Sequence, residues 1–150
     1  MIEVSNLTKA YGEKLAVDDL SFTVRPGIVT GFLGPNGAGK STTMKILLGL
    51  ASATKGSATI GGIAYRDLPD PTGTVGASVE SDAFHPGRSG RNHLRILADA
   101  TGTSLDRVDE VLDLVELSHA ANRNAGAYSL GMKQRLGLAA ALLCDPPVLV

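Results

Sequence analysis

Aromatic residues and cysteine are both scarce in this sequence. Tryptophan is absent, and aromatic side chains make up only 4% of the 150 residues. Proteins that hold single-stranded nucleic acid usually stack its bases on aromatic rings, so this composition argues against such a ligand. Cys144 is the single cysteine, which excludes an internal disulfide. Because the residues just before it are apolar, we expect Cys144 to be a small core residue.

Long apolar runs and an excess of one charge are also missing. No apolar run approaches the ~18 residues of a membrane span, and Met1 to Val4 lacks the basic start of a targeting segment. The 14 basic and 15 acidic residues nearly cancel, so nothing in the charge favours nucleic acid. The 43% hydrophobic content suits one soluble domain, and we expect any membrane part to be another chain.

Hydrophobic periodicity predicts a mixed α/β fold. The predicted strands are 2–4, 20–24, 28–33, 56–60, 75–79 and 148–150, and the predicted helices are 41–50, 91–100, 104–117 and 130–143. Residues 67–73 and 84–90 contain prolines and glycines and are expected to be loops. Helix 104–117 has Ser104 as its expected N-cap and one apolar stripe, made of Leu105, Val108, Leu112 and Val115.

A phosphate-binding loop is predicted at residues 34–41, which fit the pattern G-x-x-x-x-G-K-[ST] between a predicted strand and a predicted helix. Glycines let successive backbone N–H groups point at phosphate oxygens, Lys40 can reach the β- and γ-phosphates, and the Ser41 hydroxyl can ligate Mg²⁺. The alternative is a glycine-rich turn without a ligand. The candidate nucleotide-binding residues here are Gly34, Pro35, Asn36, Gly37, Ala38, Gly39, Lys40, Ser41 and Thr42.

A second motif narrows the choice among nucleotide-binding families. Residues 128–135 read Y-S-L-G-M-K-Q-R and resemble the signature of the ABC family, usually written L-S-G-G-Q-x-Q-R. The matching residues are Ser129, Gly131, Gln134 and Arg135, and the departures are Tyr128, Leu130 and Met132. This wording is similar to that of bacterial drug- and antibiotic-export ATPases. The alternative is an ordinary serine N-cap before an Ala/Leu-rich helix.

The resemblance covers essentially the whole chain and implies a fold. It implies an α/β P-loop NTPase with a RecA-like core, an N-terminal antiparallel β subdomain and an inserted helical subdomain, incomplete at the C-terminus. Residues 1–83 would form the β subdomain and phosphate-loop core, 84–128 the helical subdomain, and 129–150 the signature helix and the start of the Walker B strand.

The resemblance also implies cofactors, partners and further site residues. Tyr11 would stack on the adenine of ATP, although a half-buried strand aromatic is the alternative. Glu80 stands where the family usually has a glutamine that contacts Mg²⁺, with a solvated surface carboxylate as the alternative. Ser129, Gly131 and Gln134 would contact the ATP of a second subunit in a head-to-tail dimer. The implied function is the ATP-binding subunit of an exporter, in the cytoplasm, on the inner face of the membrane and beside a separate permease.

Some family residues have no counterpart among these 150. The Asp-Glu pair and the switch histidine that follow the Walker B strand are absent from this sequence, so we expect the parent protein to hydrolyse ATP and residues 1–150 alone not to do so. His85, His93 and His119 precede the signature and are expected surface or loop residues. The competing interpretations are an ABC-type ATPase without a membrane partner (a translation or DNA-repair factor), an unrelated P-loop kinase or GTPase, and a non-catalytic nucleotide-binding module.

Overall fold

Three antiparallel strands, in the order β2-β1-β3, form the sheet of the first of two compact units. The computed structural model describes residues 1–79 and 84–150, and this first unit is Met1–Pro71. Its strands are β1 (Ile2–Tyr11), β2 (Lys14–Val24) and β3 (Lys55–Ile60). The central strand β1 pairs with both neighbours, and a tight hairpin places Tyr11 directly opposite Lys14. The predicted strand 56–60 is therefore confirmed, and the predicted strands 2–4 and 20–24 are parts of longer strands.

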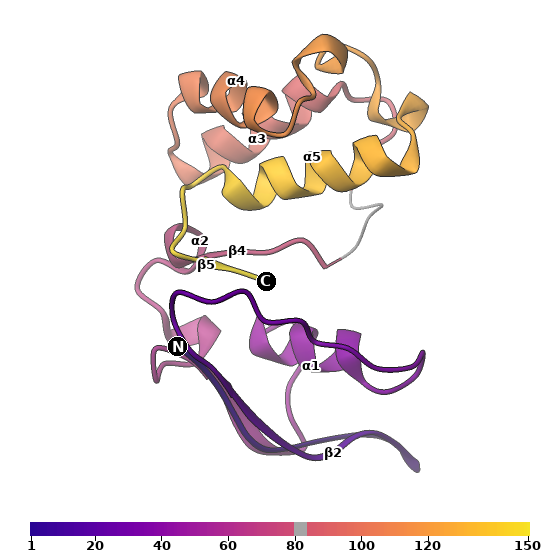
Figure 1. The fold of residues 1–150 in the computed structure, drawn as a ribbon, viewed down its shortest axis with the longest axis vertical. Coiled ribbons are helices and arrows are strands. Elements are labelled where there is room, and N and C mark those ends of the chain that lie inside the picture. Colours follow the sequence, from indigo (N-terminus) through magenta and orange to yellow (C-terminus); the bar gives the residue numbers. More distant parts are fainter. Residues whose placement is uncertain (80–83) are drawn as a thin grey trace. The chain divides into compact units, whose positions relative to one another are not determined.

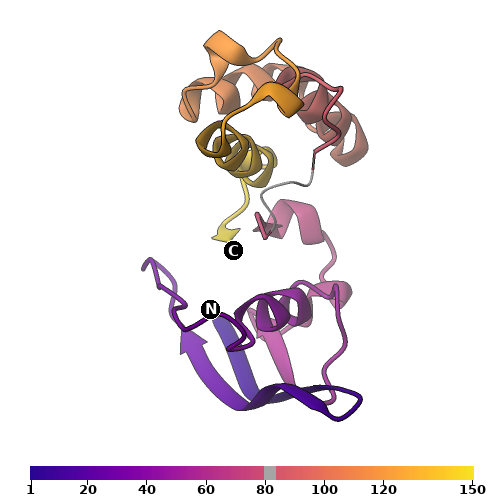
Figure 2. The same cartoon turned by 90° about the vertical axis from the view of Figure 1, so that its right-hand side faces the viewer.

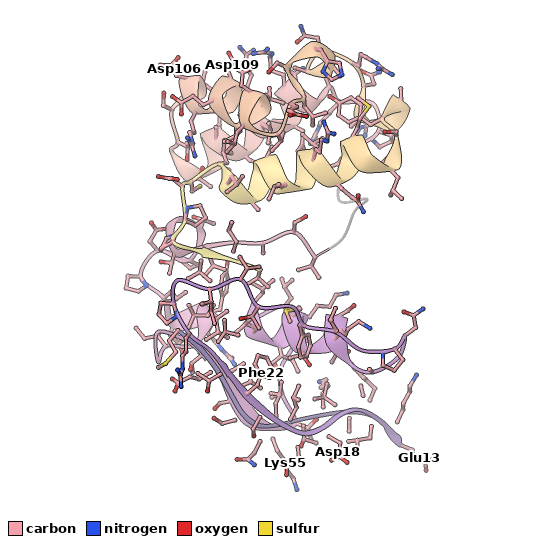
Figure 3. The ribbon with its side chains drawn as sticks, viewed as in Figure 1. Glu13, Asp18, Phe22, Lys55, Asp106 and Asp109 are labelled. Carbon is pink, nitrogen blue, oxygen red and sulfur yellow. The ribbon has the colours of Figure 1, made fainter. Side chains whose placement is uncertain are left out.

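Helix α1 (Lys40–Leu47) covers one face of this sheet (Figures 1 and 2). Strand alternation sends Val17 inward, where it is buried, and its neighbour Asp18 outward. Figure 3 shows Asp18 and Lys55 on the side of the sheet away from α1. The helix buries Ile46 and Leu47 against the sheet, so the core of the first unit lies between them. The predicted helix 41–50 is confirmed, although it ends earlier, at Leu47.

The predicted strand 28–33 is wrong. Residues 28–33 have no strand structure, and Ile28, Val29 and Leu33 are 61%, 104% and 90% exposed. A strand needs a neighbour for its backbone N–H and C=O groups, and within the described residues no strand pairs with this segment. Its apolar, β-branched composition indicated a strand without indicating a partner. The expected loop 67–73 also contains the start of helix α2 (Pro71–Thr74), and a short 3₁₀ helix, η1 (Tyr65–Asp67), overlaps its first residue.

The second unit, Thr72–Val150, is built around three helices, α3 (Gly90–Thr101), α4 (Leu105–Leu114) and α5 (Leu130–Leu142). They share one apolar core, and the connections between them include η2 (Ser118–Ala120) and η3 (Ala125–Ala127). The largest fully buried side chains of this core are Leu94, Val108, Val111, Leu112, Leu117, Leu136 and Leu143. Three predicted helices, 91–100, 104–117 and 130–143, are thus confirmed, although the second ends earlier, at Leu114. The subdomain boundaries at residues 83 and 128 stay a prediction.

Two strand and stripe predictions in this unit need correction. The parallel pair β4 (Val75–Gly76) and β5 (Val148–Leu149) is short, so strand 75–79 was predicted too long. Leu105 is 49% exposed because it begins α4, before the helix meets its neighbours. Val108, Leu112 and Val115 are buried as expected. Ser104 caps the helix as predicted, since its hydroxyl accepts a hydrogen bond from the N–H of Asp106 at 3.3 Å.

Candidate functional site

The predicted phosphate loop runs directly into the N-terminus of α1 and needs glycine to do so. Gly39 is the residue before the helix, with φ +86°, a left-handed conformation that a side chain disfavours. A Cβ added to Gly39 would lie 2.3 Å from the carbonyl oxygen of Ala16 on β2. Only a residue without a side chain lets the loop approach the strand this closely. The buried Thr43 hydroxyl then donates to the Gly39 carbonyl at 3.0 Å and fixes the first turn.

The ammonium group of Lys40 folds back onto its own loop. Its Nζ donates hydrogen bonds to the carbonyl oxygens of Gly34 at 2.6 Å and Pro35 at 2.7 Å. The N–H of Ala38 donates to the Pro35 carbonyl at 3.2 Å, which closes a turn inside the loop. The loop is therefore curved around the lysine, and Gly37, Gly39, Lys40 and Ser41 line a pocket beside it.

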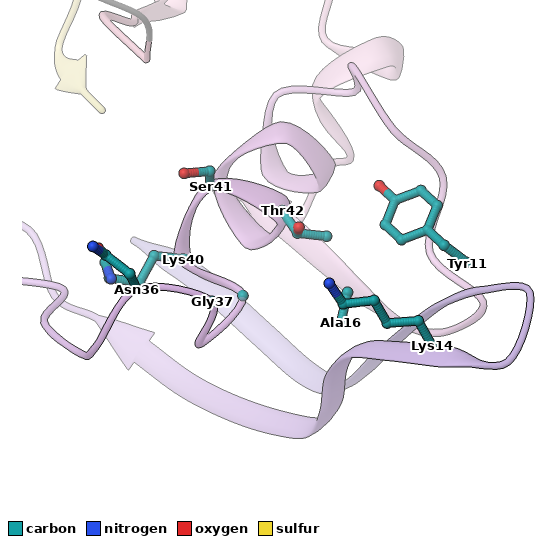
Figure 4. Close-up of a pocket in the computed structure, with 9 residues that line it drawn as sticks. Tyr11, Lys14, Ala16, Asn36, Gly37, Lys40, Ser41 and Thr42 are labelled. Atoms are coloured by element: carbon teal, nitrogen blue, oxygen red, sulfur yellow. The ribbon is translucent and has the colours of Figure 1, made fainter.

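This pocket has a volume of about 330 Å³ and brings together seven of the ten nucleotide-binding residues predicted in the first unit. Figure 4 shows the loop and the start of α1 on one side and the hairpin of β1 and β2 on the other. The lining residues are Tyr11, Lys14, Ala16, Asn36, Gly37, Gly39, Lys40, Ser41 and Thr42. Gly34, Pro35 and Ala38 do not line the pocket and instead shape the loop through their backbone.

Lys14 and Ala16 are pocket residues that the sequence motifs did not indicate. The signal for Lys14 was present in the hairpin, because a strand that pairs Lys14 with Tyr11 carries it to the same pocket. That register depends on strand pairing and not on a local pattern. Ala16 also lines the pocket, and it lies where the pairing of β1 and β2 shifts register, between Leu15 opposite Ala10 and Val17 opposite Lys9.

The ring of Tyr11 stands at the edge of the pocket and is 53% exposed. The Nζ atom of Lys9 lies 4.7 Å from the ring centroid, a cation–π contact between two residues on the same face of β1. The exposed remainder of the ring is available for stacking against a flat ligand group. Stacking of Tyr11 on adenine stays a prediction, beside the alternative of a half-buried strand aromatic.

The electrostatics of the pocket favour an anion. Its lining within the described residues includes two lysines, Lys14 and Lys40, and no acidic side chain. The N-terminus of α1 adds the positive end of a helix dipole, and the first turn of α1 contains no acidic residue to offset it. Polyphosphate is the biological group that matches a glycine-rich loop, a lysine and a helix N-terminus together.

The predicted signature residues lie in the second unit, at the start of α5. Ser129 is the N-cap, with its hydroxyl accepting from the Met132 N–H at 3.3 Å. Gly131 and Gln134 are exposed, and a Cβ on Gly131 would meet nothing within 4 Å. A helix start with open surface around it is present, while the contact of these residues with ATP stays a prediction. Glu80, the candidate at the Q-loop position, lies outside the described residues.

The remaining ligand and membrane predictions concern Mg²⁺ and the permease. Across residues 1–79 and 84–150, no group of three or more His, Cys, Asp or Glu side chains is arranged to hold a metal ion. The exposed hydroxyl of Ser41 is a hard oxygen donor inside the pocket, which suits Mg²⁺ shared with phosphates. Within those same ranges, no helix combines the length and the apolarity that a membrane crossing requires.

Comparison with known proteins identifies the family. A family model described as ABC transporter matches residues 17–150. The bacitracin transport ATP-binding protein BcrA of Bacillus licheniformis is 41% identical over 152 aligned residues, covering 100% of this chain and 50% of BcrA. The lantibiotic transport ATP-binding protein SrtF of Streptococcus pyogenes is 35% identical, with 65% of its length covered. The chain spans about half the length of most of the curated relatives that it matches.

Solved structures agree with this assignment. The dimeric structure of a post-hydrolysis state of the ATP-binding cassette MJ0796, bound to ADP and Pi, has a TM-score of 0.85 and 26% sequence identity. The similarity covers 99% of this chain and 72% of the cassette. The predicted fold class, a P-loop NTPase, is therefore confirmed, and so is the resemblance on which it rested. The chain belongs to the ABC transporter family.

Proposed function

We propose that this protein is the ATP-binding subunit of a transporter and couples the binding and hydrolysis of ATP to export through a separate membrane protein. The observation that carries the proposal is the pocket in which the phosphate loop faces Tyr11 across Lys14 and Ala16. An aromatic ring at one end and a curved glycine-rich loop with a lysine at the other match the two ends of a nucleotide.

Different residues of the pocket contact different parts of the nucleotide. The backbone N–H groups of residues 37–41 and the ammonium of Lys40 receive the β- and γ-phosphates, and Tyr11 stacks on the base. To reach a phosphate, the Lys40 ammonium exchanges the neutral carbonyls of Gly34 and Pro35 for charged oxygens, which are stronger acceptors. The Ser41 hydroxyl would hold Mg²⁺, which neutralises phosphate charge when bound.

Transport substrate and partners follow from the relatives. Bacitracin and lantibiotic transport are named for relatives that align over the whole chain, so we propose export of a peptide-like antibiotic. The related cassette is solved as a dimer, which supports a dimer here, with Ser129, Gly131 and Gln134 contacting the nucleotide of the second subunit. A permease partner would hold the protein on the inner face of the membrane, and Glu80 would lie near Mg²⁺.

The test is nucleotide binding, because we expect hydrolysis to need an Asp-Glu pair that residues 1–150 do not contain. Affinity for Mg·ATP is measured by titration calorimetry for the wild type and for Lys40→Ala. Loss of an ion pair with phosphate is expected to weaken binding by at least about tenfold.

The matched control is Lys55→Ala, which removes an exposed lysine on the outer side of the same sheet (Figure 3). Its affinity should equal that of the wild type. Equal affinity of Lys40→Ala and the wild type, with both proteins folded by circular dichroism, would contradict the proposed site.

A further inference from the structure

We propose that Lys14 is a second cationic contact for the nucleotide, directed at the α-phosphate, between the base on Tyr11 and the terminal phosphates on the loop. The proposal rests on the function proposed above and extends it to a residue outside the phosphate-loop and signature motifs. Lys14 lines the pocket together with Lys40.

Strand register fixes where Lys14 lies. Tyr11 and Lys14 are direct partners across the hairpin, so the lysine begins its strand beside the aromatic ring. Cross-strand partners have neighbouring side chains on the same face of a sheet. Figure 4 shows the side chain of Lys14 between Tyr11 and Gly37, above the strand that carries it. This is the stretch of the pocket that the middle of a nucleotide must cross.

Room for the lysine comes from Ala16. Ala16 lines the same pocket at the register shift in β2, and its small side chain leaves the Lys14 ammonium free to move along the pocket towards the loop. The backbone of Ala16 is in turn held against Gly39, so the strand and the phosphate loop are neighbours at this point. A larger side chain at position 16 would separate Lys14 from the loop.

The chemistry of Lys14 differs from that of Lys40. Lys40 is held by two carbonyl oxygens, at 2.6 and 2.7 Å, whereas Lys14 is exposed and makes no hydrogen bond or ion pair with any residue that the structure describes. A flexible ammonium of this kind acts as a movable point charge that can follow an anion. ATP and ADP share the α-phosphate and differ in the γ-phosphate. Loss of a contact at the α-phosphate should therefore lower the affinity for ATP and for ADP by the same factor.

The experiment measures the affinities of ATP and ADP, each with Mg²⁺, for the wild type, Lys14→Met, Lys14→Arg and Lys40→Met. Methionine keeps the length of the stem and removes the charge. We expect Lys14→Met to lower the affinities for ATP and ADP by the same factor, about fivefold, which is the effect of losing a partly exposed ion pair. Lys14→Arg should restore most of the affinity. Lys40→Met should weaken ATP more than ADP, because its ammonium also serves the γ-phosphate.

Three outcomes overturn the proposal: unchanged affinities in Lys14→Met, a loss confined to ATP, and a failure of Lys14→Arg to restore binding. Lys55→Met is the control for removing a lysine from the sheet, and thermal melts check that each variant folds. A wild type that binds neither nucleotide would refute the proposed function itself. A wild type that binds both, beside a Lys14→Met variant that binds them equally well, would refute only the role of Lys14.

Discussion

The hydroxyl of Tyr128 donates a hydrogen bond to the carbonyl oxygen of Ala120 at 2.7 Å. The tyrosine is only 6% exposed, and its ring occupies the space beside Gly90, where an added Cβ would come within 2.4 Å of the hydroxyl oxygen. Tyr128 directly precedes Ser129, the N-cap of α5. The start of the signature helix is therefore anchored in the core of the helical unit by a residue at which this chain departs from the common family signature.

Removing this hydroxyl should destabilise the protein. Tyr128→Phe keeps the ring and removes one of two hydrogen bonds to the Ala120 carbonyl, which also accepts from the N–H of Arg123 at 2.9 Å, so we expect the free energy of unfolding to fall by about 1 kcal/mol. Urea denaturation measures the change. Tyr11→Phe, at an exposed ring, is the matched control and should be neutral. Equal stability of the Tyr128→Phe variant and the wild type would show that the hydrogen bond contributes nothing net.

The same phenol should make stability fall at alkaline pH. Burial raises the pKa of Tyr128 above its ordinary value of 10.0, and the backbone of Gly90 and the charge of Arg123 offset only part of this. The folded protein then keeps the proton over a range in which the unfolded chain has lost it. This contribution to stability is complete below pH 10 and is lost as the pH rises through the folded-state pKa. Denaturation at pH 8 and pH 11 should differ less in Tyr128→Phe than in the wild type.

At acidic pH, His93 should make the stability of the protein fall as the pH decreases. Burial, with a smaller contribution from the charge of Arg88, lowers the pKa of His93 below 6.5, and its ring lies edge-on to Phe84 with 5.1 Å between centroids. Between the two pKa values, His93 is protonated in the unfolded chain but neutral in the folded protein. The stability is complete above pH 6.5 and is lost as the pH falls through the folded-state pKa. His93→Gln should flatten this dependence between pH 7.5 and 5, whereas His119→Gln, at an exposed residue, should not.

Substitutions at two glycines of the phosphate loop distinguish the cost of backbone strain from the cost of a steric clash. Gly37 and Gly39 have nearly the same φ, +85° and +86°, but only Gly39 faces a neighbour, the Ala16 carbonyl. Gly37→Ala should cost about 1–2 kcal/mol for the left-handed conformation alone. Gly39→Ala should cost more, because the strand must also move away. Urea denaturation of the two variants compares them, and equal losses would mean that the close contact is easily relieved.

Arg107 joins α4 to the end of α5. It donates to Glu110 at 2.9 Å and, through its other terminal nitrogen, to the Leu142 carbonyl at 3.3 Å and to Asp145 at 3.4 Å. Glu110 and Asp145 are 62% and 91% exposed, so their ion pairs should contribute little. We expect Arg107→Met to lower stability by about 1 kcal/mol through the lost carbonyl contact. Glu110→Gln and Asp145→Asn should each cost less than half of that; an equal loss in Glu110→Gln would contradict this ranking.

The features that could be predicted from the sequence are those encoded by residues close together in the chain. The phosphate loop was found because its chemistry requires glycines, Lys40 and Ser41 at fixed spacing within eight consecutive positions. Helix α4 and its cap at Ser104 were found because helical periodicity and capping are also local. The helix α5 and its N-cap at Ser129 were predicted in the same way, while the contact of the signature residues with ATP stays a prediction.

The failures have the opposite cause. Residues 28–33 have the composition of a strand, but a strand exists only with a partner, and pairing is decided far away in the sequence. Lys14 reaches the pocket through the register of the β1–β2 hairpin, which the composition of either strand does not specify. Ser129 illustrates a third limit, because the same side chain suits a helix cap and a phosphate contact, and the cap geometry is compatible with both.

The contact between Gly39 and the backbone of Ala16 has a consequence for ligand choice. Gly39 has no side chain, and the Ala16 carbonyl and the Val17 side chain lie where its Cβ would be, so the loop and the strand are already in close contact. The strand also carries the hairpin to which Tyr11 belongs. The distance between the Tyr11 ring and the phosphate loop is thus fixed. A nucleotide analogue with a longer or shorter link between base and phosphates could not contact both at once.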